Sequence, residues 1–350
     1  MLALAALALL VAAGSDVEKR IDEHASHLVG EAGVASVVVG TLADGEPRVR
    51  GYGQVTHDGG AVPDGRTVYE IGSITKTFTG ILLALAVERG EAALDDPVQE
   101  HLPEGVELQE WEGEPVRLVH LATHTSGLPR MPVDFRPASP ANPYADFDIA
   151  RLYAGLLETR LSHRPGSASE YSNLGMGLLG HALELASGAD YEALVRERVA
   201  LPLGMKDTVV VLTPALRERL APGYGPDGSP RSNWDLAALA GAGALRSTAD
   251  DLLRYARANL DPDSTPIASA IRASHEIRHE LPEGGGIALA WHSTPEGATL
   301  WHNGGTGGYR SMLVLHPGRE VAVVVLANTP SELVDSLAGD VLGLLLAEDG

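Results

Sequence analysis

The chain has 350 residues, of which 44% are hydrophobic and 21% charged, with no cysteine and a formal net charge of −21 at pH 7. The lack of cysteine excludes disulfides, a thiolate nucleophile and cysteine-ligated metals. The acidic balance argues against a nucleic-acid partner, because its phosphates would be repelled. Only three of the 26 basic residues are lysines, Lys19, Lys76 and Lys206. Arginine cannot lose its proton in a protein whereas a desolvated lysine can, so each retained lysine is a candidate for a role that needs a neutral amine.

The first 13 residues are apolar and are followed by a polar Gly-Ser-Asp sequence. A helix of that length rises only about 20 Å, which is too short to span a bilayer. Small residues at 11–13 suit cleavage, although a basic n-region is missing. We therefore predict a signal peptide over residues 1–14, and a secreted or periplasmic protein without a transmembrane anchor beyond that segment. The alternative is an apolar start to the first helix.

Hydrophobic patterning then predicts strands near both ends of the chain and helices between them. An amphipathic helix is expected over 16–29, strands over 34–40 and 48–55 around an Asp44-Gly45 turn, and a mostly helical region from 73 to 260. Further strands are expected over 287–292, 299–302, 309–315 and 321–326, before a helix over 331–346. This order predicts an α/β (α+β) fold in which the two termini build one sheet, covered by the terminal helices, and a helical insertion forms the rest. We expect a single catalytic unit over 15–350, with a sheet subdomain from 15–66 and 283–350 and a helical subdomain over 67–282. The proline-rich segment 131–145 is the candidate cleft-lining loop.

Residues 73–76 (SITK) are the first candidate site. They start the run 77–87, which is apolar nearly all round and so predicts a buried helix. The i, i+3 spacing places the Ser73 hydroxyl and the Lys76 amine on one helix face. At a helix N-terminus the dipole favours an alkoxide and disfavours an ammonium. The alternative is an N-capping serine followed by a surface lysine.

Residues 171–173 (YSN) lie between a Pro-Gly loop and a second apolar helical run. Tyr171 could carry a proton to a leaving group, and Asn173 could bind a substrate amide. In the alternative, Asn173 caps the helix and Tyr171 only packs.

Residues 301–308 (WHNGGTGG) follow a predicted strand. Glycines at a strand end let a substrate backbone approach and add as a further strand. The alternative is a flexible loop. A phosphate-binding P-loop is excluded because no G-K-[ST] follows.

One motif points to a different class of enzyme. His275 and His279 match H-E-x-x-H, the zinc-peptidase helix motif. Zinc needs a third protein ligand and a continuous helix, but Pro282 and the glycines 284–286 end any helix within a turn. We therefore predict an exposed polar helix end here, no metal site and no cofactor.

The three candidate motifs, in this order and with LATHTSGLP (121–129) and GAGALRSTADD (241–251) between them, resemble the family of class C β-lactamases, D-alanyl-D-alanine carboxypeptidases and family VIII esterases. The resemblance covers the chain after residue 15. It implies a β-lactamase/transpeptidase-like fold with an antiparallel sheet, and a penicillin-recognising serine hydrolase that needs no cofactor or metal.

By this resemblance Ser73 is the nucleophile, Lys76 its proton acceptor, Tyr171 a second proton carrier and Asn173 a ligand of the acyl side chain. The backbone N–H groups of Ser73 and Gly305 form the oxyanion hole.

The third motif of the family is K-T-G in class C β-lactamases and H-x-G in related peptidases and esterases. Here it reads His302-Asn303-Gly304, which the resemblance implies is substrate-binding. Neutral histidine anchors a carboxylate less well than lysine, so efficient penicillin hydrolysis is in doubt. No counterpart of the class A deacylating glutamate is identifiable.

The sequence therefore predicts hydrolysis of an amide or ester through an acyl-enzyme on Ser73, with a small-molecule or peptide acyl substrate and no obligate protein partner. It leaves open whether the substrate is a β-lactam, a D-Ala peptide or a small ester. The alternatives are a zinc metallopeptidase using His275 and His279, a penicillin-binding sensor that stalls as the acyl-enzyme, and an inactive scaffold.

Overall fold

A computed structural model of the chain describes residues 2–30, 33–133 and 135–348. Its centre is one sheet of eight strands in the order β2-β1-β12-β11-β10-β9-β8-β7, and neighbouring strands run antiparallel. The first strands are β1 (Ser36–Ala43) and β2 (Glu46–Gly53), and the last are β10 (Leu300–Gly305), β11 (Arg310–His316) and β12 (Val321–Ala327). The far edge holds β7 (His279–Glu280), β8 (Gly286–Ile287) and β9 (His292–Ser293). The predicted antiparallel sheet built from both ends of the chain is confirmed.

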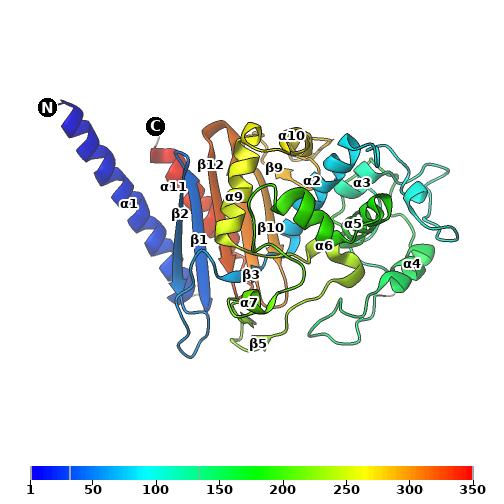
Figure 1. Cartoon of the computed structure of the whole chain (residues 1–350), viewed down its shortest axis with the longest axis horizontal. Helices are drawn as coiled ribbons and strands as arrows, with labels where there is room; N and C mark the ends of the chain where they lie inside the picture. The colour runs from blue at the N-terminus through cyan, green and yellow to red at the C-terminus, as the bar shows by residue number, and fades with distance from the viewer. Residues whose placement is uncertain (1, 31–32, 134, 349–350) are drawn as a thin grey trace.

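The central strands are apolar on both faces, because each face is covered. Along β12, Val323 and Val325 belong to the core shared with α1 (Leu2–Gly30) and α11 (Leu333–Glu348). Val324 and Leu326 point to the opposite face and join the larger core, as the two-residue period of a strand requires. Both terminal helices therefore cover the same face of the sheet (Figure 1).

The other face is covered by α9 (Ala249–Leu260), which lies against β1 and β12 (Figure 1). This corrects two parts of the predicted division into subdomains. The segment 67–282 is not wholly separate from the sheet, because it supplies α9. The C-terminal part of the sheet also begins at His279, in β7, rather than near residue 283.

Helices dominate the rest of the chain around α2 (Thr75–Glu88) and α5 (Asn173–Ser187). The others are α3 (Leu118–Ala122), α4 (Ile149–Glu158), α6 (Tyr191–Val195), α7 (Pro214–Arg217), α8 (Ala240–Gly243) and α10 (Ala268–His275). Two strand pairs lie outside the large sheet, β3 (Val68–Glu70) with β6 (Arg246–Thr248) and β4 (Gly223–Tyr224) with β5 (Pro230–Arg231).

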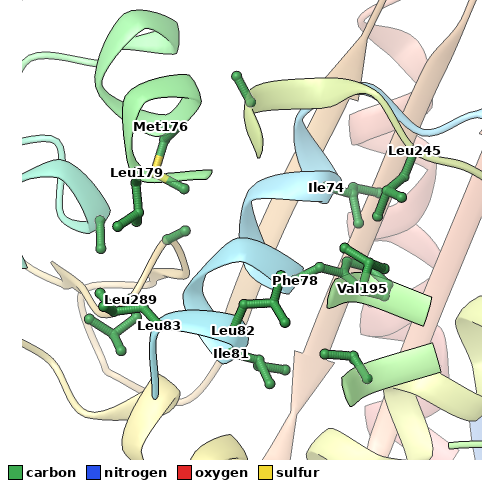
Figure 2. Close-up of a cluster of buried hydrophobic side chains, with 14 of the residues drawn as sticks. Ile74, Phe78, Ile81, Leu82, Leu83, Met176, Leu179, Val195, Leu245 and Leu289 are labelled. Atoms are coloured by element: carbon green, nitrogen blue, oxygen red, sulfur yellow. The ribbon is translucent and has the colours of Figure 1, made fainter. Parts of the chain in front are cut away.

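Helix α2 is the predicted buried central helix. Every residue from Thr75 to Ala86 is buried. Apolar side chains from several segments lie around its Phe78, Leu82 and Leu83 (Figure 2). Each fully buried side chain of this size contributes about 1.5–3 kcal/mol to stability, so α2 is a rigid support for whatever its first turn carries.

Two sequence-based expectations differ in part from the structure. The single strand predicted over 287–292 is a turn between β8 and β9, in which Ala290 has a left-handed φ of 65°. The residues 287–291 are apolar because all of them are buried. An apolar run predicts burial, but it does not distinguish an extended strand from a buried turn. The helix predicted over 16–29 is present, but it is the second half of a helix that begins at Leu2. No helix in the described part of the chain is long and apolar enough to cross a membrane.

Candidate active site

Ser73 lies in a short 3₁₀ turn, Gly72–Ile74, that links β3 to α2. The turn is held against the sheet, because Ser311 Oγ donates to the Ile71 carbonyl oxygen at 2.8 Å. Gly72 has a φ of +49°, and a β-carbon there would lie 2.7 Å from the Gly305 amide nitrogen. Only glycine suits a left-handed backbone in such close contact, so the serine is brought directly beside β10.

Lys76 lies one helical turn after Ser73, and its side chain is fully buried. Its Nζ lies 2.9 Å from Ser73 Oγ, 2.9 Å from Asn173 Oδ1 and 2.6 Å from the Ala242 carbonyl oxygen. Among the described residues, no carboxylate forms an ion pair with this amine. Lys76 is therefore neither a surface lysine nor a structural cation.

Burial lowers the pKa of Lys76 well below its usual value, and the nearby Arg130 charge lowers it further. A buried ammonium without a counter-ion is strongly disfavoured. A neutral amine has two hydrogens and one lone pair. The Asn173 and Ala242 oxygens can only accept, so they take the two hydrogens and leave the lone pair for the Ser73 hydroxyl proton.

Asn173 reaches Lys76 because another residue caps the helix. Ser172 is the N-cap of α5, where its Oγ accepts from Gly175 N at 2.8 Å. The alternative in which Asn173 caps the helix is wrong. Asn173 lies at the first helical position, and its side chain is free to turn into the site.

Tyr171 lies between the nucleophile and a group of basic side chains. Burial raises its pKa to about 12, although a hydrogen bond with Ser73 and the Arg130 charge act in the opposite direction. Its ring centre is 4.8 Å from Lys76 Nζ and 5.0 Å from Arg130 Cζ. At neutral pH the phenol is protonated, so it is a proton donor in the resting site.

The Gly305 amide points away from the strand ladder. Thr306 N donates to Tyr309 O, and pairs alternate in an antiparallel ladder. The next pair, Gly305 with Arg310, is therefore not hydrogen-bonded, and the Gly305 N–H faces away from β11. Together with the adjacent turn at Gly72, this geometry is suited to an oxyanion hole formed by the Ser73 and Gly305 amides.

The other residues of the third motif divide between the two faces of β10. His302 is buried and faces Tyr171, with ring centres 6.3 Å apart. Asn303 points the opposite way, where its Nδ2 donates to Asp335 of α11 at 2.7 Å. The structure does not bring the Asn303 side chain to Ser73, which leaves only its backbone for a substrate. A β-carbon at Gly304 would lie 2.0 Å from the Ile71 carbonyl oxygen, so this glycine allows the close contact of β10 with the serine turn.

His302 is a neutral acceptor. Its Nδ1 lies 2.6 Å from the Asn303 carbonyl oxygen, which can only accept, so Nδ1 carries the hydrogen and Nε2 has a lone pair. Burial lowers the pKa of His302 well below its usual value, and the neighbouring His292 and Lys76 add to the effect. This ring cannot replace the lysine of K-T-G as a cation.

Two further histidines lie in the site, His124 beside Tyr171 and His292 beside His302, and sequence reasoning gave them no role. The His124 ring lies 4.4 Å from the Tyr171 ring, and the His292 ring 5.3 Å from that of His302. Burial lowers the pKa of His292 to about 4, with a smaller effect of Lys76, and that of His124 well below its usual value. His124 lies inside the LATHTSGLP segment (121–129), which was the available signal. These rings are polar but uncharged neighbours in the site, unlike Arg130, whose guanidinium carbon lies 5.0 Å from the Tyr171 ring centre.

The H-E-x-x-H match does not form a metal site. Helix α10 ends at His275, and His279 lies in β7, so the pair lacks the continuous helix that zinc peptidases use. His275 Nε2 is instead 2.8 Å from Asn259 Oδ1. The predicted exposed helix end is corrected in part, because His275 is half-buried against Trp291. In the part of the chain that the structure describes, no three potential ligands gather to hold a metal.

Comparisons with known proteins identify the family of the chain. The Beta-lactamase family matches residues 21–348. The D-alanyl-D-alanine-carboxypeptidase/endopeptidase AmpH of Escherichia coli is 31% identical over 334 residues, covering 90% of this chain and 84% of AmpH. A Pseudomonas fluorescens beta-lactamase is 25% identical, covering 90% of this chain and 94% of that enzyme.

The fold is likewise that of solved members of this family. The beta-lactamase/D-alanine carboxypeptidase from Yersinia pestis, solved with citrate, has a TM-score of 0.81 at 26% identity, covering 95% of this chain and 98% of that one. The D-alanine carboxypeptidase AmpC from Burkholderia cenocepacia gives 0.80 at 26% identity, covering 94% and 99%. The chain belongs to the Beta-lactamase family and is a serine hydrolase of the β-lactamase/D-Ala-D-Ala carboxypeptidase type.

Proposed function

We propose that the chain is a D-alanyl-D-alanine peptidase that forms its acyl-enzyme on Ser73. The observation that carries this proposal is the 2.9 Å contact between Ser73 Oγ and the buried Nζ of Lys76, an amine without a carboxylate partner among the described residues. This arrangement supplies a serine with a neutral base at hydrogen-bond distance.

In the proposed acylation, the Ser73 proton moves to the Lys76 lone pair as Oγ attacks the substrate carbonyl carbon. The amides of Ser73 and Gly305 stabilise the negative oxygen that develops. Tyr171, protonated in the resting site, gives its proton to the leaving nitrogen and recovers one from Lys76. The C–N bond breaks and the amine departs. Water then attacks the ester, and the same groups return the proton to Ser73 Oγ as the acid is released.

The choice of a D-Ala peptide over a β-lactam rests on His302 and on the relatives. His302 is neutral where class C β-lactamases have a lysine, which weakens recognition of the penicillin carboxylate at this position. The AmpH relative is named a carboxypeptidase/endopeptidase and is 31% identical, whereas the named beta-lactamases are 25–28% identical. Peptidoglycan peptides lie outside the cytoplasm, so the proposal includes a secreted or periplasmic location, action on a small-molecule or peptide substrate, and no obligate protein partner.

Steady-state rates on three substrates test the proposal side by side: an acyl-D-Ala-D-Ala peptide, nitrocefin, and p-nitrophenyl butyrate. Of the two amide substrates, the peptide is expected to give the higher kcat/KM, well above that of nitrocefin. One D-alanine should be released for each peptide cleaved. Intact-mass spectrometry after penicillin should find the adduct on Ser73. Faster turnover of nitrocefin would make the chain a β-lactamase. A permanent adduct without turnover of any substrate would make it a sensor, and turnover of the ester alone an esterase.

A further inference from the structure

The site contains few groups that could hold a substrate anion. Lys76 is buried with all three of its polar contacts made within the protein. His302 presents a bare Nε2, which repels rather than binds a carboxylate. Arg310 is near Gly305, but its Nε donates to Asp335 Oδ1 at 2.9 Å and a second nitrogen also contacts Asp335. None of these three side chains offers a cation without a partner in the protein to a substrate carboxylate.

Arg130 is a further cation close to Tyr171. Its guanidinium carbon is 5.0 Å from the centre of the Tyr171 ring, and its side chain is exposed. Among the described residues, no carboxylate lies within ion-pair distance of it. In a chain with 47 acidic and only 26 basic residues, an arginine beside Tyr171 that lacks a carboxylate partner is unusual. Its charge is permanent, unlike that of the neighbouring histidines.

The backbone fixes where this side chain starts. The Arg130 carbonyl oxygen accepts from the amides of Asn173 and Leu174 at 3.0 and 3.1 Å. These two bonds tie Arg130 to the first turn of α5, the same turn that presents Asn173 to Lys76. The guanidinium therefore projects from a defined point of the site.

We propose that Arg130 binds a carboxylate on the leaving-group side of the substrate and sets a preference for anionic leaving groups. This inference rests on the proposed function, in which Tyr171 protonates the leaving nitrogen. In a C-terminal D-alanine the carboxylate is attached to the carbon next to that nitrogen. Because the Arg130 guanidinium lies over the Tyr171 ring, it would lie next to this substrate carboxylate. A guanidinium can donate to both carboxylate oxygens.

The test uses two substrates with the same acyl group. One is an acyl-D-lactate depsipeptide, or the corresponding thioester of D-thiolactate, with a free carboxylate on its leaving group. The other is the same compound with that carboxylate converted to its methyl ester. The ratio of kcat/KM, anionic over neutral, is measured for the wild type, Arg130→Met, Arg130→Gln and Arg130→Lys. The matched control is Arg89→Met, which removes the same charge from the exposed C-cap of α2, about 24 Å of helix rise from Ser73.

The ratio is expected to fall about 10- to 100-fold in Arg130→Met and Arg130→Gln, as loss of a charge-assisted hydrogen bond requires. Arg130→Lys should recover part of it, and Arg89→Met should leave it unchanged. A ratio within twofold of wild type in both neutral variants would overturn the proposal, whatever happens to the separate rates. Because both substrates share Ser73 and Lys76, effects of Arg130 on the lysine pKa or on folding cancel in the ratio.

Failure of this inference is distinguishable from failure of the proposed function. If the wild type turns over both substrates through Ser73 but the ratio does not depend on Arg130, only the anion site is refuted. If the wild type releases no D-alanine from the peptide and prefers the methyl ester, the peptidase function and the anion site are both refuted.

Discussion

Replacement of Lys76 by arginine separates a base from a mere positive charge. Lysine in this site is neutral for part of the proposed cycle, because burial lowers its pKa and two acceptors occupy its hydrogens. Arginine has a similar length and keeps its proton at all accessible pH values. It can preserve the charge of the residue but not its lone pair.

The expected loss is large for two reasons. General-base catalysis is worth about 10²–10⁴ in rate, and arginine forfeits it. A guanidinium in the fully buried position of Lys76 also lacks a counter-ion, which destabilises the fold by roughly 3–5 kcal/mol. We expect acylation per folded molecule to fall at least about 10³-fold, or about 4 kcal/mol at 1.36 kcal/mol per tenfold, and Lys76→Ala to be equally impaired.

Pre-steady-state acylation rates of four variants test this reasoning, with thermal melts to count the folded protein. Lys19→Arg and Lys206→Arg are the controls, because both side chains are exposed and should match the wild type. If Lys76→Arg acylates at a near wild-type rate, the lysine is only a positive charge. Tyr171 would then have to be the base.

Three further predictions follow from the site. Ser73→Ala should retain less than about a thousandth of wild-type kcat with an unchanged melting curve; greater residual activity, or a penicillin adduct elsewhere, would remove Ser73 as the nucleophile. Gly72→Ala should reduce kcat at least about tenfold, because its β-carbon would lie 2.7 Å from the Gly305 amide nitrogen; a silent substitution, seen beside Gly90→Ala at an open turn, would mean that this contact does not shape the site. EDTA should not change activity and His279→Ala should be nearly silent; stoichiometric zinc whose removal abolishes turnover would contradict the serine mechanism.

The sequence was sufficient where local pattern and burial agree. The apolar run after Ser73 predicts a buried helix, and α2 is one. The Asp44-Gly45 turn between two predicted strands predicts the β1–β2 hairpin, which the structure contains. In both cases neighbouring residues carry the whole signal, so no distant contact is needed to interpret it.

The sequence was insufficient where the determining contact comes from far along the chain. Nothing near Lys76 indicates that the Ala242 carbonyl oxygen, 166 positions away, will accept a hydrogen bond from its Nζ at 2.6 Å. The adjacent Ser172 and Asn173 are both good helix caps, and only Lys76 on another helix gives Asn173 a different partner. The His124 ring lies 4.4 Å from the Tyr171 ring, and the His124 backbone has a left-handed φ of 58°. Nothing in the adjacent sequence predicts that contact.

The distribution of charge also bears on which group activates water during deacylation. Glu70 lies three residues before Ser73 and is buried, so it is the obvious carboxylate to consider. Its Oε1, however, accepts from the Trp234 amide at 2.9 Å and lies 3.4 Å from Arg246 Nη2. Burial raises the pKa of Glu70, and the opposing effect of Arg246 is the largest of those that lower it. This carboxylate joins β3 to β6 and to the segment at Trp234, so we propose that Lys76 or Tyr171, rather than Glu70, activates water in the second step.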